Sequence, residues 1–198
     1  MLTFKKGGGT VARPRKFERS EALDKAMLVF WQKGYEATFL DDLTEAMGIN
    51  RPSLYNAFGD KHALYMEALA RYRDLYSGKM LAALSGAPSL KAGFRCVFDS
   101  FIAEATKGCC PGCMIVNSTV EACAGSESVA EFVEETDAAS VQAFTVALQN
   151  GDVAADKDPR ALAVYLYSAI QGFQVRAKAG DERQTLETIA ALALSVLD

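Results

Sequence analysis

The chain has 198 residues, half of them hydrophobic, which is enough to bury a core in one domain or in a small and a larger one. No apolar run approaches the roughly 18 residues of a membrane-spanning helix, and the N-terminus lacks the apolar core of a signal peptide. We therefore expect a cytoplasmic protein without a membrane partner. The five cysteines, an odd number, argue against a secreted disulfide scaffold and predict reduced thiols.

The net charge of −4 is distributed unevenly along the chain. Residues 1–80 carry 13 basic and 10 acidic side chains, whereas residues 81–198 carry 8 basic and 15 acidic ones. The first part, with a net charge of +3, can approach a polyanion such as DNA, but such an excess is also ordinary surface variation. A motif has to decide between these two interpretations.

The N-terminal part predicts a flexible tail followed by short helices. Residues 1–12 lack apolar periodicity and contain three consecutive glycines, which predicts the tail. A stripe of apolar residues at helical spacing then covers about residues 19–34. A second helix is predicted over about residues 40–47, with Thr38 and Asp41 forming its capping box.

A third short helix is predicted directly after Gly48. Asn50 can cap it, Pro52 falls in its first turn, and Leu54 and Phe58 lie one turn apart on one face. With the second helix it has the proportions of a helix-turn-helix, in which the second of the two helices enters the major groove of DNA.

The remainder of the chain is also predicted to be helical. Asp60 can cap a longer helix that we expect to link two domains. Further helical patterns cover about residues 90–107, 113–123, 126–149, 159–179 and 182–197, and no stretch alternates convincingly at the period of a strand. The sequence therefore predicts an all-α fold of about nine helices.

The outward face of the third helix has the chemistry of a DNA-reading surface. Leu54, Ala57 and Phe58 are predicted to pack inward. The side chains left to project outward are Arg51, Ser53, Tyr55 and Asn56. Arginine can donate two hydrogen bonds to guanine, asparagine can pair with adenine, and the tyrosine hydroxyl can reach a phosphate oxygen. The alternative is a solvated polar face, but an exposed aromatic beside an arginine, with Lys61 downstream, is less expected of inert surface.

A long and specific run of residues lies between Arg13 and Tyr72. It consists of Gly34, Tyr35, Thr38, Asp42, Leu43, Ala46, Gly48, Ile49, Ser53, Leu54, Tyr55, Phe58, Lys61 and Leu64. In this run the chain closely resembles the TetR family of transcriptional regulators. The rest is similar only in being helical and of typical length for the family's ligand domain. The resemblance implies a DNA-binding regulator that is not an enzyme, with repression as its usual mode.

For individual residues, the resemblance implies backbone contacts with double-stranded DNA by Thr38, Tyr55 and Lys61. It also implies a base-reading surface made by Arg51, Pro52, Ser53, Tyr55 and Asn56. Phe39 departs from the family, which often has Ser or Thr there, and this puts one phosphate contact in doubt. The basic segment 13–16 is either an auxiliary DNA contact or a solvated tail.

Three cysteines close to a Pro-Gly turn, Cys109, Cys110 and Cys113, are the candidate sensor of an effector. The Cys110-x-x-Cys113 spacing occurs in thiolate metal sites and redox dithiols. A zinc site is not expected, because the only histidine, His62, lies in the DNA-binding half and there is no second Cys-x-x-Cys. We expect no metal and no cofactor.

Helical spacing offers a second interpretation of these cysteines. Cys113, Val116, Val120 and Cys123 recur at the spacing of a buried helical stripe, and Cys96 has the same interpretation. Inert packing is therefore preferred to sensing of oxidants, electrophiles or a soft metal such as Cu(I). A thiol enzyme using Cys110 and Cys113 is disfavoured by the absence of predicted strands and of a convincing base, and a dimeric helical adaptor is a further alternative.

Residues 161–179 and 184–197 are apolar around much of their circumference. The residues responsible are Leu162, Leu166, Ile170, Phe173, Ile189, Leu192, Leu194, Val196 and Leu197. Paired across a two-fold axis, two such helices would form a four-helix interface, so we expect a homodimer that presents two recognition helices to a palindromic operator.

The expected division of the chain is a tail (1–12), a helix-turn-helix DNA-binding domain (13–60), a linking helix (61–80) and a regulatory and dimerisation domain (81–198). Aromatic residues of the last domain can either line a cavity for a small-molecule effector or fill a core, and the core is preferred for any single residue. They are Phe94, Phe98, Phe101, Phe132, Phe144, Tyr165, Tyr167 and Phe173. The identity of the effector stays open.

Overall fold

The computed structural model describes residues 17–107, 112–122, 126–151 and 156–198. Within these ranges the regular structure is nine α-helices and one short 3₁₀-helix, with no strand, so the predicted all-α fold of about nine helices is confirmed. The helices are α1 (Arg19–Lys33), α2 (Leu40–Met47), α3 (Arg51–Phe58), α4 (Lys61–Ser85), α5 (Leu90–Ala105), α6 (Met114–Ala122), α7 (Glu127–Gln149), α8 (Pro159–Lys178), α9 (Arg183–Leu194) and η1 (Ser195–Leu197). The tail, the basic segment 13–16, Cys109, Cys110 and Cys123 lie outside the described residues.

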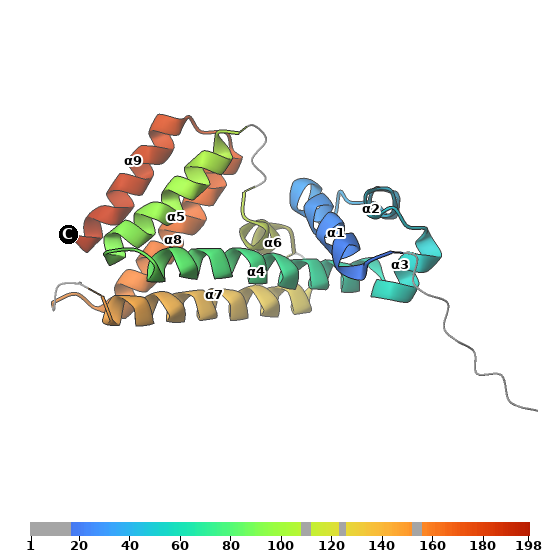
Figure 1. Cartoon of the computed structure of the whole chain (residues 1–198), viewed down its shortest axis with the longest axis horizontal. Helices are drawn as coiled ribbons and strands as arrows, with labels where there is room; N and C mark the ends of the chain where they lie inside the picture. The colour runs from blue at the N-terminus through green and yellow to red at the C-terminus, as the bar shows by residue number, and fades with distance from the viewer. Residues whose placement is uncertain (1–16, 108–111, 123–125, 152–155) are drawn as a thin grey trace, which may run out of the picture.

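The molecule is elongated, with α4 and α7 running side by side along its length (Figure 1). The helices α1, α2 and α3 lie at one end, and α5, α8 and α9 lie at the other. The short helix α6 contacts α4, α7 and α8 between these two groups. Helix α4 reaches from one group to the other and continues to Ser85.

Two hydrophobic cores match this arrangement. The first contains Phe30, Leu43, Leu54 and Leu64 from the first four helices, and it also takes in Met114 of α6. The second lies among α5, α7, α8 and α9, and its fully buried side chains include Phe94, Phe98, Phe144, Leu166 and Phe173. The sequence left open whether the aromatic residues of this part line a cavity or fill a core. Four of them, Phe94, Phe98, Phe144 and Phe173, belong to a core.

Local capping explains where α3 and α4 begin. The side chain of Asn50 accepts a hydrogen bond from the Ser53 N–H at 2.9 Å, and Asp60 accepts one from the Ala63 N–H at 2.8 Å. Both predicted caps are thus present. The backbone of Gly48 is left-handed (φ 68°), a conformation that glycine adopts without steric cost, and it ends α2.

The predicted capping box of Thr38 and Asp41 is wrong. The residue before α2 is Phe39, and its backbone N–H donates to the Asp42 carboxylate at 2.9 Å. The Thr38 hydroxyl instead donates to the Gly34 carbonyl at 2.6 Å, which takes it away from the start of the helix. The acidic half of a capping box is therefore made one residue later than predicted.

Candidate nucleic-acid interface

The pair of helices α2 and α3 is fixed by a small apolar contact beneath an exposed polar surface. Leu43 and Met47 of α2 and Leu54 and Phe58 of α3 are buried, and both pairs belong to the first core. The residues between the helices form a turn, in which the N–H of Ile49 donates to the Thr44 carbonyl at 3.1 Å. Helix α3 therefore packs against the rest of the protein with one side and exposes the other.

The opposite side of α3 carries the residues predicted to read DNA. Arg51, Pro52, Tyr55 and Asn56 are exposed, and Ser53 is half-buried. These side chains occupy two consecutive turns of one short helix, with donors suited to guanine and adenine edges and an exposed phenol. The major groove of DNA admits an α-helix, and the exposed groups of α3 are of the kinds that hydrogen-bond to base edges there.

An ion pair joins this surface to α2, and it could not be seen in the sequence pattern. Nε and Nη2 of Arg51 donate to Oδ1 of Asp41 at 3.2 and 2.7 Å. Asp41 lies in the first turn of α2 and Arg51 begins α3, so that the pair crosses the turn. The Asp41 carboxylate raises the pKa of Arg51, which remains a cation.

Lys61 lies at the start of α4, three residues after the end of α3. Its Nζ sits 4.3 Å from the centroid of the Tyr35 ring, a cation–π contact that holds the ammonium near the DNA-facing helices. The N-terminus of α4 has partial positive charge from its free N–H groups, and an anion such as phosphate is favoured there. Both features suit Lys61 to the backbone role predicted for it.

Thr38 does not belong to the exposed surface. Its side chain is fully buried and its hydroxyl is committed to the Gly34 carbonyl. In this conformation the Thr38 hydroxyl is not free to contact a phosphate, and the DNA-backbone contact implied for Thr38 stays a prediction. Phe39, the next residue, is by contrast 71% exposed.

Comparison with known proteins decides the family of the chain. Residues 22–68 match the family model of the bacterial regulatory proteins of the tetR family. The repressor ComR of Escherichia coli K12 is 34% identical over 191 residues, which cover 92% of this chain and 90% of ComR. The chain belongs to the TetR family. It is therefore a DNA-binding transcriptional regulator and not an enzyme.

Two solved structures share the fold, and one of them is a TetR-family regulator. A double cysteine mutant of CifR, solved with a 26-bp double-strand operator DNA, superposes with a TM-score of 0.83 at 36% identity and covers 94% of this chain and 100% of CifR. The reduced form of E. coli NemR superposes with a TM-score of 0.82 over 91% of this chain and 96% of NemR. At 20% identity, NemR supports the fold alone.

Helix α6 ties the C-terminal part of this regulator to its DNA-binding helices. The Glu121 carboxylate accepts a hydrogen bond from the Tyr35 N–H at 2.9 Å, directly after α1. Ahead of α6, the Trp31 indole donates to the Gly112 carbonyl at 2.8 Å. The hydroxyls of Tyr65 and Ser118 lie 2.8 Å apart in the core. Burial of this last contact raises the pKa of Tyr65 to about 12.

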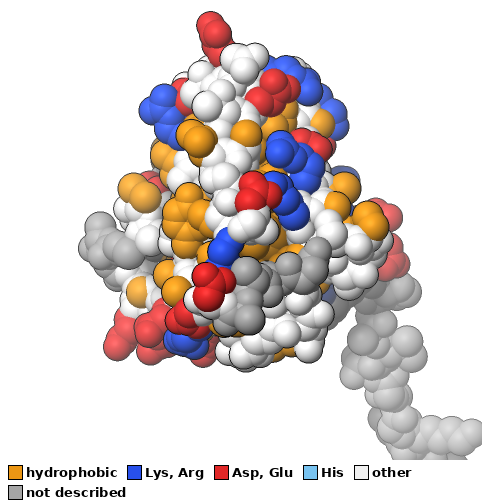
Figure 2. Space-filling model, turned by 90° about the vertical axis from the view of Figure 1, so that its left-hand side faces the viewer, with side chains coloured by type: hydrophobic (Ala, Val, Ile, Leu, Met, Phe, Trp, Pro, Cys, Tyr) orange, Lys and Arg blue, Asp and Glu red, His pale blue; other side chains and the backbone are white. Residues whose placement is uncertain are grey.

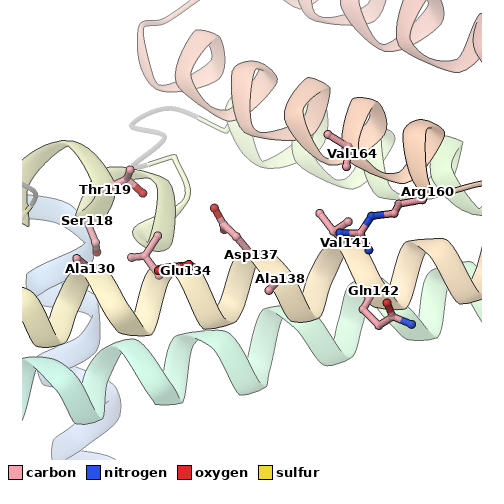
Figure 3. A pocket seen from close by; sticks show the side chains of 11 residues that line it. Ser118, Thr119, Ala130, Glu134, Asp137, Ala138, Val141, Gln142, Arg160 and Val164 are labelled. Carbon is pink, nitrogen blue, oxygen red and sulfur yellow. The ribbon is translucent and has the colours of Figure 1, made fainter.

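A cavity of about 770 Å³ opens on the other side of α6, between α6, α7 and α8. Its floor is apolar, with Val133 and Val141 of α7 and Val164 of α8. Asp137 projects from α7 between these residues, and Arg160 reaches back from α8 toward Val141 (Figure 3). Ser118 and Thr119 of α6 line the edge of the cavity, and Glu121 of the same helix accepts the hydrogen bond from Tyr35.

A polar group lies beneath this cavity, although neighbouring positions are apolar. The Tyr167 hydroxyl donates to Asp137 at 2.6 Å, and the Gln171 amide lies 3.2 Å from the same carboxylate. Burial and the adjacent carboxylate raise the pKa of Tyr167 well above its usual value. Sequence reasoning missed this group because its members come from two helices, 30 or more positions apart.

Cys96 and Val120 differ from the predicted packing, whereas Cys113 packs against the first core as predicted. Cys96 is exposed, because the buried stripe of α5 passes through Phe94, Val97 and Phe98 instead. Val120, predicted on the buried stripe of α6, is 78% exposed. Both assignments to buried stripes were therefore wrong. Within the described ranges no three His, Cys, Asp or Glu side chains are grouped as metal ligands.

Cys113 lies at the start of α6 and is largely enclosed. Burial raises the pKa of its thiol, and this outweighs the N–H groups of Val116 and Ile115 and the Tyr72 hydroxyl, which all lower it. A helix N-terminus alone would favour the thiolate. In this environment the neutral thiol is favoured, so Cys113 is a poor nucleophile in the conformation described.

The helices predicted to form a dimer interface divide into a buried and an exposed face. Leu162, Leu166, Ile170, Phe173 and Leu194 pack within the chain. Large apolar side chains that stay exposed on these helices are Val164, Tyr165, Val175 and Leu192. Figure 2 looks onto this end of the molecule and shows hydrophobic patches between charged side chains. In the described ranges, no helix is long and apolar enough to cross a membrane.

Proposed function

We propose that this regulator is a homodimeric, sequence-specific repressor that acts in the cytoplasm. The observation that carries the proposal is the exposed face of α3, where Arg51, Tyr55 and Asn56 project from a helix anchored by Leu54 and Phe58. The CifR complex with operator DNA and the name of ComR as a repressor support it.

The proposed interface makes two kinds of contact, one with base edges and one with the sugar-phosphate backbone. Arg51 and Asn56 contact base edges, with Pro52 and Ser53 beside them, while Tyr55 and Lys61 hold the sugar-phosphate backbone. The exposed position of α3 and the place of Lys61 at the start of α4 support this division. Thr38 acts indirectly, because its hydroxyl fixes the turn ahead of α2.

A dimer is the second element of the proposal. The unpaired apolar side chains of α8 and α9 would pair with those of a second copy, and this would place two recognition helices on a palindromic operator. Two linked half-sites increase affinity without new contacts in either half. The exposure of Val164, Tyr165, Val175 and Leu192 supports this interface.

Control by a small-molecule effector is the third element. The cavity between α6, α7 and α8 is the candidate site, because α6 lines it and also holds the Tyr35 N–H through Glu121. An effector that binds more tightly to the conformation unable to hold DNA would shift the population of the dimer and release the operator.

Thiol-based or soft-metal control through Cys109, Cys110 and Cys113 is the second candidate, and Cys109 and Cys110 lie outside the described residues. The observation that favours it is the place of Cys113 at the start of α6, close to the contacts with the DNA-binding helices. The raised pKa of Cys113 opposes it, because the reactive thiolate is then scarce. Loss of DNA binding after treatment with peroxide or Cu(I), with resistance in Cys113→Ser, would favour this candidate.

Selection from a library of random-sequence duplexes tests the proposed function. We expect the purified protein to enrich a palindrome of two half-sites at low ionic strength, in the presence of reductant. Arg51→Ala should lose the preference for one base in each half-site while it keeps the remaining pattern. Absence of any enrichment by the folded wild-type protein, with or without reductant, would overturn the proposal.

A further inference from the structure

Asp41 of α2 and Arg51 of α3 form an ion pair. Among the hydrogen bonds of the described residues, it is the one that joins a proposed base-reading side chain to a side chain of α2. Both side chains are well exposed, at 79% for Asp41 and 56% for Arg51. An exposed ion pair contributes little to folding because water screens it and two flexible side chains must be ordered. Stability therefore does not explain the pair.

The position of Arg51 at the start of α3 leaves its side chain without a fixed orientation unless Asp41 holds it. Arg51 is the first residue of α3, where the positive end of the helix dipole disfavours a cation. A long, flexible side chain in this place would sample many rotamers in the free protein. The carboxylate of Asp41 compensates the charge and holds the guanidinium in one place across the turn.

The bonds to Asp41 leave one edge of the Arg51 guanidinium free, and this is the edge that can bind guanine. Its five N–H groups are arranged along a planar fork. Asp41 receives the Nε–H and one Nη2–H, which form one side of the fork. The end of the fork, with N–H groups on Nη1 and Nη2, stays free to donate two parallel hydrogen bonds to O6 and N7 of guanine.

We propose that Asp41 is a positioning residue for base recognition: it orients Arg51 so that the free end of the guanidinium faces a guanine in the major groove. This inference rests on the proposed function, because it requires α3 to lie in that groove. Asp41 sharpens sequence preference while its negative charge lowers affinity for all duplexes, since it offsets one cation near the phosphates.

A matched acidic residue separates orientation from charge. Glu45 is exposed on α2 one turn after Asp41, so that Glu45→Ala removes the same charge from the same helix without removing the partner of Arg51. Both Asp41→Ala and Glu45→Ala should raise the affinity for random duplexes alike. Asp41→Ala alone should weaken the choice of guanine. Asp41→Asn, which keeps a neutral acceptor, should fall between Asp41→Ala and the wild type.

The test selects binding sites for each protein from one library of random-sequence duplexes and compares base preference by position. In Asp41→Ala, preference for guanine at the position that depends on Arg51 should fall by roughly 2- to 12-fold, the effect expected when one flexible side chain must be ordered on binding. Arg51→Ala should lose this preference entirely. The double variant should show the same base preference as Arg51→Ala, because Asp41 affects the choice of base only through Arg51.

The outcomes distinguish this inference from the function on which it rests. If the wild type selects a palindrome and Asp41→Ala selects it with unchanged guanine preference, the positioning role is overturned and the proposed function stands. The same holds if Asp41→Ala sharpens the preference, or if Glu45→Ala weakens it equally. If the wild type selects nothing, both fail.

Discussion

The DNA-binding helices and the C-terminal helices of this regulator differ in where their polar side chains point, outward into solvent in the first case and inward between helices in the second. On α3, Arg51, Tyr55 and Asn56 project outward from an apolar base. Between α7 and α8, Asp137 and Tyr167 form a polar group that reaches inward beneath a cavity. Groups on a free surface are available to a large, rigid partner such as DNA, whereas enclosed groups suit a small ligand.

The two parts are joined through specific contacts, which include the shared first core and the hydrogen bonds that join α6, Gly112 ahead of it, and α7 to α1 and α4. In the proposed dimer a second copy supplies the second recognition helix, and within one chain α4, α6 and α7 connect the C-terminal part to the DNA-binding helices. Variants that remove these connections show how far each part works alone. They follow, from the largest expected effect to the smallest.

Breaking the dimer should have the largest effect. Leu192→Asp places a charge on an α9 side chain that is 64% exposed in one chain and that we propose is covered by the second. Loss of the linked second half-site should lower operator affinity by roughly 100- to 10,000-fold. Sedimentation should show a monomer, and DNA retardation should report the affinity.

The control for this variant is Leu81→Asp, which adds the same charge to an exposed leucine on α4. It should leave both the dimer and the affinity unchanged. A monomeric Leu192→Asp protein that binds operator as tightly as the wild type would contradict the dimer model.

Removing the contact between α6 and the DNA-binding helices should have the next largest effect. Glu121→Ala leaves the Tyr35 N–H without its acceptor, so hydrogen exchange of this amide should accelerate by roughly 5- to 150-fold, as expected for an unsatisfied group in a partly buried site. Exchange followed by mass spectrometry measures the change.

The conservative variant Glu121→Gln keeps a carbonyl oxygen that can accept the same hydrogen bond. Slow exchange should therefore return in Glu121→Gln. Equal exchange rates in the wild type and in Glu121→Ala would show that α6 does not hold the DNA-binding helices at this point.

Removing the proposed backbone contact should have a smaller and uniform effect. Lys61→Ala should weaken binding to all duplexes alike and reduce the slope of log affinity against log salt by about 0.9, the value for one phosphate. Titrations at several salt concentrations measure this slope.

Lys79 provides a close control on the same helix. Its Nζ also lies over a tyrosine ring, that of Tyr76, at 4.8 Å, but 18 residues further along α4. Lys79→Ala should leave the slope unchanged. An equal reduction by both variants would mean that Lys61 acts only through the general charge of the protein.

The smallest expected effect on DNA binding comes from modification of Cys96. Alkylation at pH 7.5 should modify the exposed Cys96 at least about tenfold faster than the enclosed Cys113, and DNA binding should persist when only Cys96 has reacted. Peptide mass spectrometry gives the two rates. Faster reaction at Cys113 would instead favour thiol sensing.

The same burial predicts how pH acts on Cys113. Its pKa is raised in the folded state, so the stability that its neutral thiol contributes is present below the unfolded-state pKa and is lost as pH rises through the folded-state pKa. The wild type should therefore lose stability in mildly alkaline solution to a greater extent than Cys113→Ser, and denaturant unfolding at several pH values measures the difference.

The sequence predicted those features that depend on neighbours along the chain. The caps at Asn50 and Asp60, the turn at Gly48 and the inward face of α3 are each set within one or two turns. The place of the exposed reading surface followed from them. These local signals also carry the resemblance to the TetR family, which is why the family could be recognised.

Most of the errors and omissions arose where distant residues decide. Cys96 and Val120 were misplaced because the covered face of a helix depends on which helices pack against it. The error at Thr38 is local by contrast, because its hydroxyl bonds to the Gly34 carbonyl four residues earlier instead of capping α2. The partnership of Asp41 and Arg51 crosses a turn between two helices. Periodicity along one helix contains no information about such pairs.

Chemical probing of the major groove tests the central claim most directly. Dimethyl sulfate methylates guanine at N7, the atom that Arg51 is proposed to contact. On a selected operator, methylation of one guanine in each half-site should prevent binding of the wild type but not change binding of Arg51→Ala further. If guanine methylation nowhere interferes with binding of the wild type, α3 does not read the major groove through Arg51, and the account of this surface is contradicted.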